Sequence, residues 1–337
     1  MTTTATPLRI ASIGAGGWGT VVARQILADD RATLVALADV SADSRSRAGA
    51  ALGVPAEMRF EDTERMLDTV DLDAVVVTTP HALHHEHVSL AMDRGLHVYC
   101  EKPFTTSVAD ARDLLDRAET RGPVTMVGFQ RHHEQPYLAA RERIHEATPR
   151  LVTAEITQDW YENFHDTWRA NPDLSGGGQL YDTGSHLVDI VLWFTDSPPT
   201  SASAEMVFAD DAERVDVHAL LTIRFENGAV ANLTVSGDTA AVREHVHVWT
   251  DDGATYIDGR GWHERTLHEV DAENTTTTPM LDDEGSRGKI EAFVDAVADG
   301  TEPPVTARHG YYVTAVLEAA YESARDGGRR VRIDGDD

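Results

Sequence analysis

The sequence has very little cysteine and lysine, and no long apolar run. Its single cysteine, Cys100, excludes an internal disulfide and is typical of a protein kept in a reducing compartment. No apolar stretch approaches the ~20 residues that a helix needs to cross a bilayer. The first residues, MTTTATPLRIASIG, lack the basic region and the apolar core of a signal peptide. We therefore expect a cytoplasmic protein with no membrane partner.

Basic side chains are also scarce: 29 face 57 acidic ones, and the formal net charge of the 337 residues is -28. The acids are scattered singly and in pairs, as on the solvated surface of a folded protein. Such a surface repels nucleic acid, so nucleic acid is not an expected partner. We expect a halophilic protein, because molar salt shortens the Debye length to ~3 Å and screens this self-repulsion.

The chain has only two lysines, Lys102 and Lys289, and all its other basic residues are arginines. Arginine could supply positive charge anywhere on the surface. A retained Lys102 therefore indicates a need for a compact ammonium group. For Lys289 we expect a place on a helix surface.

The N-terminal segment has the order strand, glycine turn, helix, strand, acid. Leu8 to Ile13 is predicted as a buried strand, and it leads into Gly14-Ala15-Gly16-Gly17-Trp18-Gly19, which fits G-x-G-x-x-G. A helix is expected from Thr20, and a second strand from Thr33 to Ala38 precedes Asp39. This order is typical of dinucleotide binding, with the pyrophosphate on the helix N-terminus and the acid on the adenine ribose. The charge of Asp39 favours NAD over NADP, although Arg45 and Arg47 keep NADP open.

Alternating strands and helices continue to about residue 128, which predicts a doubly wound parallel sheet, the Rossmann fold, over residues 1–128. Thr79 and Pro80 follow the buried strand AVVVT, and Glu101 and Lys102 follow the next strand. Ligands of open α/β sheets bind at these carboxyl ends. All four residues are therefore candidates for the coenzyme crevice.

The pattern changes after residue 128, and we expect residues 129–337 to form an α+β domain with a large open, mostly antiparallel sheet. Alternating segments at Val217–Phe225, Val230–Val235 and Val242–Thr250 predict strands, and Glu226-Asn227-Gly228 predicts a hairpin turn. The C-terminal segment is expected to be able to pack back on the first domain.

A conspicuous segment of this second half is SGGGQLYDTGSHLVD, from Ser175 to Asp189. Its three glycines predict a flexible turn where the backbone approaches another molecule. A helix is expected after them, and there Asp182 and His186, four residues apart, would share one face. The imidazole could move a proton of a bound hydroxyl. The plainer alternative is a buried His–Asp hydrogen bond at a helix start.

Together these motifs resemble the Gfo/Idh/MocA family (glucose-fructose oxidoreductase, inositol dehydrogenase, rhizopine catabolism protein). The resemblance covers nearly the whole chain and adds Thr79-Pro80 with His84, Glu101-Lys102-Pro103, and a helix–strand end from Phe293 to Ile333. The family implies NAD(P)-dependent oxidoreductases of sugars and polyols, often oligomeric through the second-domain sheet. We accordingly expect a homo-oligomer, a dimer or a tetramer.

The resemblance also implies roles for single residues. Lys102, Asp182 and His186 correspond to the family's catalytic residues, and the Lys102–Pro103 peptide is expected to be cis. Physical chemistry agrees, because His186 could accept the hydroxyl proton while Lys102 stabilises the charge on the oxygen. Expected substrate ligands are Lys102, Gln130, Tyr161, Arg169, Asp182 and His186. Expected coenzyme contacts are Gly14, Gly16, Gly17, Trp18, Gly19, Asp39, Thr79, Pro80, His84, Glu101 and Lys102. His81 stands where many relatives have asparagine.

We therefore expect an NAD-dependent enzyme that transfers a hydride between the coenzyme and a sugar, polyol or cyclitol hydroxyl. Three alternatives remain: a glycosidase that uses NAD transiently, a reductase of a non-sugar carbonyl compound, and an NAD-sensing regulator without catalysis.

No metal site is expected. His81, His84, His85 and His87 form a histidine-rich helix without a closed ligand set, and we interpret them as a polar helix face with His84 near the coenzyme. His132, His133, His245 and His247 are interpreted as ordinary sheet and loop residues.

Overall fold

The computed structural model describes residues 6–262, 264–281 and 287–335, which form two compact units. The first unit comprises Met1–Thr105, Ala109–Phe129 and Arg287–Gly310. The second comprises Thr106–Val108, Gln130–Ser286 and Tyr311–Asp337. The chain thus returns to the first unit late, through residues 287–310.

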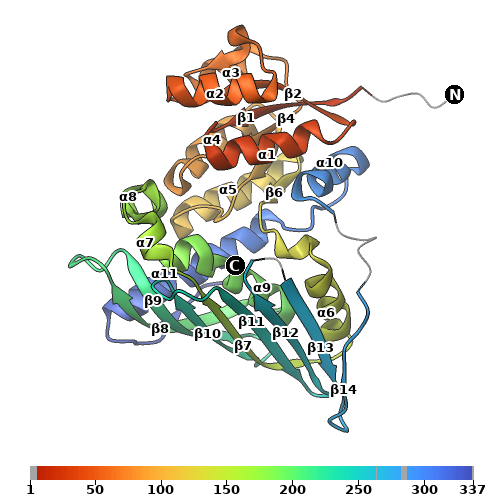
Figure 1. Ribbon diagram of the computed structural model, residues 1–337, viewed down its shortest axis with the longest axis vertical. Coiled ribbons are helices and arrows are strands. Elements are labelled where there is room, and N and C mark those ends of the chain that lie inside the picture. The colour runs from red at the N-terminus through yellow and green to blue at the C-terminus, as the bar shows by residue number, and fades with distance from the viewer. Residues whose placement is uncertain (1–5, 263, 282–286, 336–337) are drawn as a thin grey trace, which may run out of the picture. The chain divides into compact units, whose positions relative to one another are not determined.

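The first unit is built on a parallel sheet whose described strands have the order β3-β2-β1-β4-β5-β6 (Figure 1). This is the strand order of a doubly wound dinucleotide-binding sheet, as predicted. The strands are β1 (Leu8–Ile13), β2 (Ala32–Ala38), β3 (Arg59–Phe60), β4 (Ala74–Val77), β5 (His97–Cys100) and β6 (Thr125–Val127). The helices are α1 (Gly17–Leu27), α2 (Ala42–Leu52), α3 (Thr63–Thr69), α4 (His84–Met92), α5 (Val108–Arg121) and α10 (Lys289–Asp299).

The core of the first unit explains why the late helix α10 belongs to it. Ile290 and Phe293 are fully buried in one cluster with Val22 of α1 and Tyr99 of β5. The rings of Phe293 and Tyr99 meet edge to face, with centroids 6.0 Å apart. Burial of these side chains therefore fixes α10 beside α1 and the sheet.

The second unit is built on a mixed sheet with the order β14-β13-β12-β11-β7-β10-β9-β8-β15 in the described part of the chain (Figure 1). Only the pairing of β10 with β7 is parallel among these neighbours, so the predicted mostly antiparallel sheet is confirmed. Its strands are β7 (Pro149–Thr157), β8 (Pro199–Phe208), β9 (Asp216–Phe225), β10 (Val230–Ser236), β11 (Arg243–Thr250), β12 (Ala254–Arg260), β13 (Glu264–Val270), β14 (Thr276–Thr277) and β15 (Val331–Arg332). Its helices are α6 (Gln135–His145), α7 (Trp160–Phe164), α8 (Pro172–Ser175), α9 (Ser185–Thr195) and most of α11 (Ala307–Arg325).

Side chains alternate across this sheet. On β11, Val246 and Val248 are fully buried, whereas the neighbours His245 and His247 are half-buried. Helices α6 and α9 pack on the sheet through contacts with β12 and β7, respectively. The period-2 pattern seen in the sequence therefore separates a covered face from a more exposed one.

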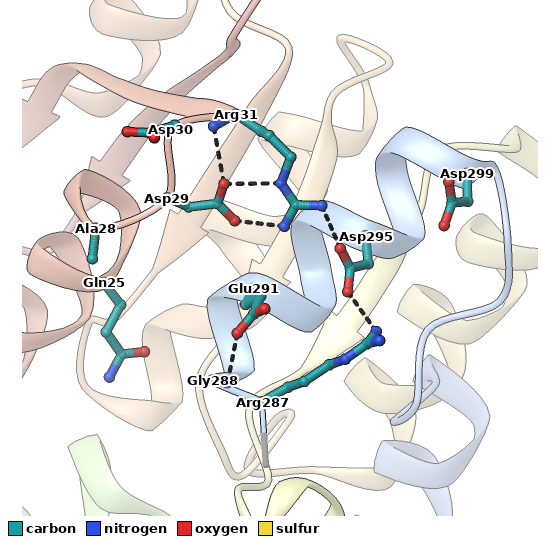
Figure 2. Close-up of a pocket in the computed structure, with 10 residues that line it drawn as sticks. All are labelled: Gln25, Ala28, Asp29, Asp30, Arg31, Arg287, Gly288, Glu291, Asp295 and Asp299. Atoms are coloured by element: carbon teal, nitrogen blue, oxygen red, sulfur yellow. Dashed lines mark hydrogen bonds and ion pairs between the residues drawn. The ribbon is translucent and has the colours of Figure 1, made fainter. Parts of the chain in front are cut away.

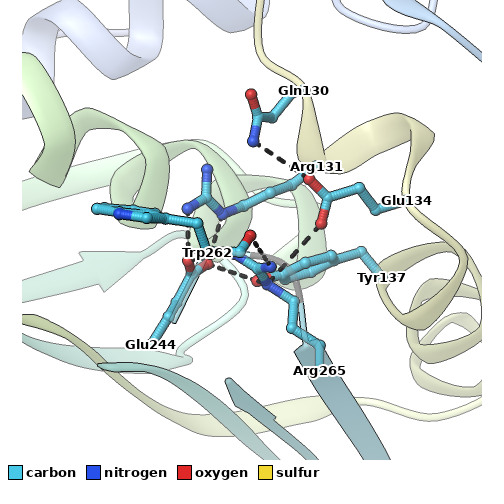
Figure 3. A network of polar contacts seen from close by, with 7 residues as sticks. All are labelled: Gln130, Arg131, Glu134, Tyr137, Glu244, Trp262 and Arg265. Carbon is cyan, nitrogen blue, oxygen red and sulfur yellow. Dashed lines mark hydrogen bonds and ion pairs between the residues drawn. The ribbon is translucent and has the colours of Figure 1, made fainter. Parts of the chain in front are cut away.

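A buried ionic network ties helix α6 to strands β11 and β13 (Figure 3). The guanidinium of Arg131 pairs with the carboxylate of Glu244, and Arg265 donates to the same carboxylate over 2.8 Å. Tyr137 donates its hydroxyl to Glu244 over 2.5 Å. Burial by itself would raise the pKa of Glu244, but the two arginines outweigh it and lower that pKa to about 2.

We predict that Glu244→Gln destabilises the protein by about 3–5 kcal/mol, because two buried guanidinium groups lose their shared counter-ion. The pH dependence has a definite sign. The pKa of Glu244 falls from 4.5 unfolded to about 2 folded, so its contribution of about 3 kcal/mol is present above pH 4.5 and is lost towards pH 2. Urea unfolding between pH 2 and 7 measures this, with the exposed Glu226→Gln as the matched control. Equal acid sensitivity in wild type and Glu244→Gln would contradict the assignment.

Candidate functional site

The glycine turn after β1 leaves its backbone open where a phosphate would lie. Gly14 has a φ of +96°, and a Cβ there would lie 2.9 Å from the carbonyl of Thr78. A Cβ on Gly19 would clash with the Gly14 carbonyl. At Gly16 and Gly17, by contrast, a Cβ would meet nothing within 4 Å. The first and last glycines therefore serve tight packing, while the middle ones leave the N-terminus of α1 open to a pyrophosphate, and the residues present fit a dinucleotide.

Asp39 closes this turn from the end of β2. One carboxylate oxygen accepts the N–H of Ala15 over 2.7 Å, and the other accepts the N–H of Ser41 over 2.8 Å. Two backbone N–H groups thus hold the carboxylate of Asp39 against the glycine turn.

Arg45 and Arg47, which left NADP possible as a coenzyme in the sequence analysis, both have local hydrogen-bond partners. Arg45 donates to the carbonyl of Asp39 over 2.7 Å and pairs with Glu61 over 3.4 Å. Arg47 donates to the carbonyl of Asp43 over 3.4 Å. These contacts hold both guanidinium groups against their own helix region.

His84 links the two loops that follow β4 and β5. Its ring nitrogens lie 3.0 Å from the carbonyl of Thr79 and 2.9 Å from the carbonyl of Pro103. Burial lowers the pKa of His84, and the two carbonyl contacts act against that shift. His84 and His81 are buried, so the interpretation of these histidines as a polar helix face is wrong for both.

The Glu101-Lys102-Pro103 segment follows β5, and its Lys102–Pro103 peptide is cis, as predicted. The carboxylate of Glu101 is buried and accepts the Tyr99 hydroxyl over 2.8 Å and the Lys289 ammonium over 2.6 Å. Burial acts to raise the pKa of Glu101, but Lys289 outweighs it and the pKa is lowered. Lys102 itself is half-buried.

The expectation that Lys289 lies on a helix surface is therefore wrong. The residue is 7% exposed, and its side chain enters the interior beside Glu101. One signal in the sequence could have found it: the chain keeps only two lysines, and this is the second.

In the second unit, the triple-glycine turn packs closely against other parts of the chain. Asp216 of β9 accepts the N–H of Gly178 over 3.0 Å and the N–H of Leu180 over 2.9 Å, and it accepts the Tyr321 hydroxyl. A Cβ on Gly178 would clash with the backbone of Asp216. The turn is thus tightly packed. Strand β9 of the same chain makes the close backbone approach that the sequence analysis assigned to another molecule.

The segment after the glycines begins as a π-helix, Leu180–Gly184, and becomes the α-helix α9 at Ser185. Asp182 therefore lies in a widened turn, which is frequent at functional sites, and the simple four-residue spacing to His186 does not apply. His186 is half-buried, while the rest of the stretch from Leu180 to Leu192 is buried.

In the second unit, Asp182 belongs to a cluster of polar and aromatic side chains. Its Oδ2 accepts the Trp160 indole N–H over 2.8 Å and pairs with Arg169 over 3.2 Å. The Arg169 guanidinium lies 5.0 Å from the ring centre of Phe164 and 4.7 Å from that of Trp168. A carboxylate, a guanidinium and flat rings together can bind hydroxyl groups and the apolar face of a sugar ring.

The other two expected substrate ligands lie in the same unit. Tyr161 follows Trp160 in α7 and is 36% exposed. Gln130 donates to Glu134 over 3.3 Å, at the edge of the ionic network in Figure 3. The structure thus brings Arg169 to Asp182, and it places Gln130 beside the Glu244 network.

On the second-unit sheet, His245, His247 and Asp258 place one possible metal-ligand atom each within 4.8 Å of the others. His245 and His247 lie 2.7 and 2.9 Å from the same oxygen of Asp258 on the neighbouring strand. Burial acts to raise the pKa of Asp258, but these two hydrogen bonds outweigh it and lower that pKa. Asp258 is thus the hydrogen-bond partner of both histidines, as in an ordinary polar cluster on a sheet.

A cavity of about 760 Å³ lies between the end of α1 and the start of α10 (Figure 2). Part of its charged lining is paired internally: Arg31 binds Asp29 over 2.7 Å and Asp295 over 2.5 Å, and Arg287 binds Asp295 over 2.8 Å. It lies at the far end of α1 from the glycine turn, about 16 Å away for 11 residues. The cavity is therefore separate from the dinucleotide turn.

We predict that Asp39→Ala weakens the preference for NAD over NADP, because the variant loses the acceptor for ribose hydroxyls and the charge that repels a 2'-phosphate. Calorimetric titration with each dinucleotide measures the ratio of dissociation constants. The exposed Asp43→Ala is the matched control and should leave the ratio unchanged. An unchanged ratio in Asp39→Ala would mean that another residue recognises the ribose.

Two family profiles match the chain. Residues 8–129 match the one described as "Oxidoreductase family, NAD-binding Rossmann fold", and residues 137–256 match the "GFO/IDH/MocA C-terminal domain". No helix in the described residues is both long and apolar enough to cross a membrane.

Curated relatives and solved structures agree with these matches. D-xylose 1-dehydrogenase (NADP(+)) 2 of Haloferax volcanii is 29% identical over 82% of this chain and 85% of its own length. D-xylose 1-dehydrogenase [NADP(+)] of Haloarcula marismortui is 26% identical over 96% of this chain and 92% of its own. The structure of aldose-aldose oxidoreductase from Caulobacter crescentus, complexed with glycerol, has the same fold, with a TM-score of 0.85 at 23% identity over 97% of this chain and 99% of that one. The chain belongs to the Gfo/Idh/MocA family of oxidoreductases, whose first domain is an NAD-binding Rossmann fold.

Proposed function

We propose that the protein is an NAD-dependent dehydrogenase that oxidises a hydroxyl group of a sugar, polyol or cyclitol. The observation that carries the proposal is the open Gly16–Gly17 backbone closed by Asp39, which fits a dinucleotide. The cluster of Asp182, Arg169 and aromatic rings supports a polyhydroxylated substrate. The two D-xylose dehydrogenase relatives, which bear the coenzyme name NADP(+), support the reaction class and keep NADP as a second coenzyme.

The coenzyme, when bound, supplies a nicotinamide carbon that takes up the hydride. His186 would accept the hydroxyl proton, since a half-buried imidazole can exchange protons near neutral pH. Lys102 would hold the substrate oxygen and stabilise the negative charge that develops on it. Asp182, already bonded to Trp160 and Arg169, would hold a neighbouring hydroxyl. Tyr161 and Gln130 would contribute further contacts to the substrate.

We predict that His186→Ala lowers kcat by about 10²- to 10⁴-fold, the usual contribution of a positioned proton-transfer group. Lys102→Ala should lower kcat by about 10²- to 10³-fold, the usual contribution of a group that stabilises charge on a reacting oxygen. The dissociation constant of NAD should change much less, because the proposed roles of both groups concern the substrate, and Lys102 is only one of eleven expected coenzyme contacts. NADH absorbance with a panel of sugars and polyols at high salt measures turnover. His145→Ala, on the exposed surface of α6, is the matched control. Full activity in both variants would refute the assigned roles.

We further propose that this enzyme works in a halophilic cytoplasm as a homo-oligomer. The net charge of -28 supports the salt requirement. The single buried thiol of Cys100 supports a reducing compartment. Large apolar side chains exposed on the second-unit sheet, Val207 at 56% and Leu220 at 55%, support a contact between copies of the chain.

One salt series is expected to test both properties. In molar salt, light scattering should give the mass of a dimer or tetramer of the 36.8 kDa chain, and thermal unfolding should have its highest midpoint. At low salt the midpoint should fall, because the acidic surface is no longer screened. Equal stability at low salt would refute the halophilic proposal, and a monomeric mass throughout would refute the oligomer.

A further inference from the structure

Lys289 occupies a position that its local sequence does not explain. It is the first residue of α10, where the positive end of the helix dipole disfavours a cation. It is also buried, although burial of an ammonium is costly unless the charge is paired. Its position must therefore be stabilised by contacts made elsewhere in the unit.

Those contacts converge on a single nitrogen. The ammonium donates to Glu101 over 2.6 Å and to the carbonyl of Gly128 over 3.1 Å. It also lies 5.4 Å from the ring centre of Trp18 and 5.8 Å from that of Tyr99. A compact ammonium with three donors suits acceptors arranged around one point, whereas the planar fork of arginine does not. In a chain that otherwise uses arginine, this geometry explains why a lysine is kept.

The three backbone segments joined in this way lie at the carboxyl ends of parallel strands. Trp18 lies in the first turn of α1, shortly after β1, whereas Glu101 follows β5 and Gly128 follows β6. In open α/β sheets this edge is where ligands bind. Trp18 is 46% exposed beside the open Gly16–Gly17 backbone, so its ring can be fixed by the ammonium below it and still face a ligand.

The positive charge of Lys289 has a second effect, which acts through the carboxylate of Glu101. The Glu101 carboxylate interacts electrostatically with both lysines of the chain, and Lys289 has the larger influence on its pKa. Lys289 neutralises Glu101 through one carboxylate oxygen, and the other oxygen accepts the backbone N–H of Lys102 over 3.3 Å, so the ion pair also holds the segment that carries Lys102. Without Lys289, the buried Glu101 would lose its counter-ion and take up a proton more readily, which would change how it holds the Lys102 segment.

We propose that Lys289 is a positioning residue of the coenzyme and catalytic site. It acts on Lys102 through Glu101 and acts directly on the ring of Trp18. The part that concerns Lys102 rests on the proposed dehydrogenase function, whereas the part that concerns Trp18 and the nucleotide does not.

The first test uses the nucleotide-free protein and compares Lys289→Met, Glu101→Gln and the double variant. In Lys289→Met, Glu101 is buried without a counter-charge, so its folded pKa rises above that of the unfolded carboxyl. The loss in unfolding midpoint should therefore grow as the pH rises from 5 to 8. The double variant has no unpaired charge and should recover most of the midpoint and lose this pH dependence. Arg287→Met, which removes an exposed guanidinium two residues away, is the matched control.

The second test separates positioning from stability in the double variant. Its fold should be stable, yet calorimetric titration should show weaker NAD binding, and kcat should fall by about a hundredfold, as for a reacting group displaced by about 1 Å. Wild-type NAD affinity and kcat in the double variant would show that Lys289 only stabilises the fold, and the proposal would be wrong. If the wild type turns over no sugar or polyol, the dehydrogenase proposal fails, and the NAD titration still decides the role of Lys289.

Discussion

In both functional segments, the glycine turn after β1 and the triple-glycine turn, backbone packs directly on backbone, and this packing fixes the position of the segment. Gly19 leaves no space for a Cβ against the carbonyl of Gly14, and Gly178 leaves none against the backbone of Asp216. In each case the glycine places main-chain N–H groups at a fixed position: the first pair shapes the N-terminus of α1, and Gly178 donates to a buried carboxylate. The conformational entropy that glycine loses on folding is offset by close packing that other residues could not reach. Asp182, four residues after Gly178, depends on this fixed start.

Buried carboxylates in the described chain are compensated by different means. Glu244 has two guanidinium groups, and Glu101 has an ammonium and a tyrosine hydroxyl. Asp216 accepts two backbone N–H groups and the Tyr321 hydroxyl, and burial raises its pKa. The kind of partner determines what the carboxylate does. Guanidinium groups lock distant elements together, whereas N–H donors orient one turn of the chain.

The sequence predicted much of the fold because the fold follows local periodicity. The alternation of buried strands and helices before residue 128, with the glycine turn and Asp39, was sufficient to predict a doubly wound sheet. Alternation in β9, β10 and β11 likewise predicted an antiparallel sheet. Such patterns depend only on which side of an element faces the core, and a single sequence contains that information.

The features that were missed depend on partners that are distant in sequence or on small changes in a turn. Lys289 is buried because Glu101, 188 residues earlier, receives its charge. His84 is buried because the carbonyls of Thr79 and Pro103 lie on either side of its ring. The π-helix at Leu180–Gly184 widens one turn without a change in composition, so the helical spacing of Asp182 and His186 could not reveal it.

The late return of the chain to the first unit has a consequence for biosynthesis. When the ribosome has made residues 1–129, the strands of the parallel sheet exist, but α10 and its lysine do not. Until residue 299 emerges, the partners of Phe293 lie uncovered, and the carboxylate of Glu101 has no counter-ion from α10. The nucleotide-binding half therefore completes its interior only after most of the other half has been translated. A fragment ending near residue 130, although it contains the whole coenzyme motif, would expose an apolar surface and a charge that the complete chain conceals.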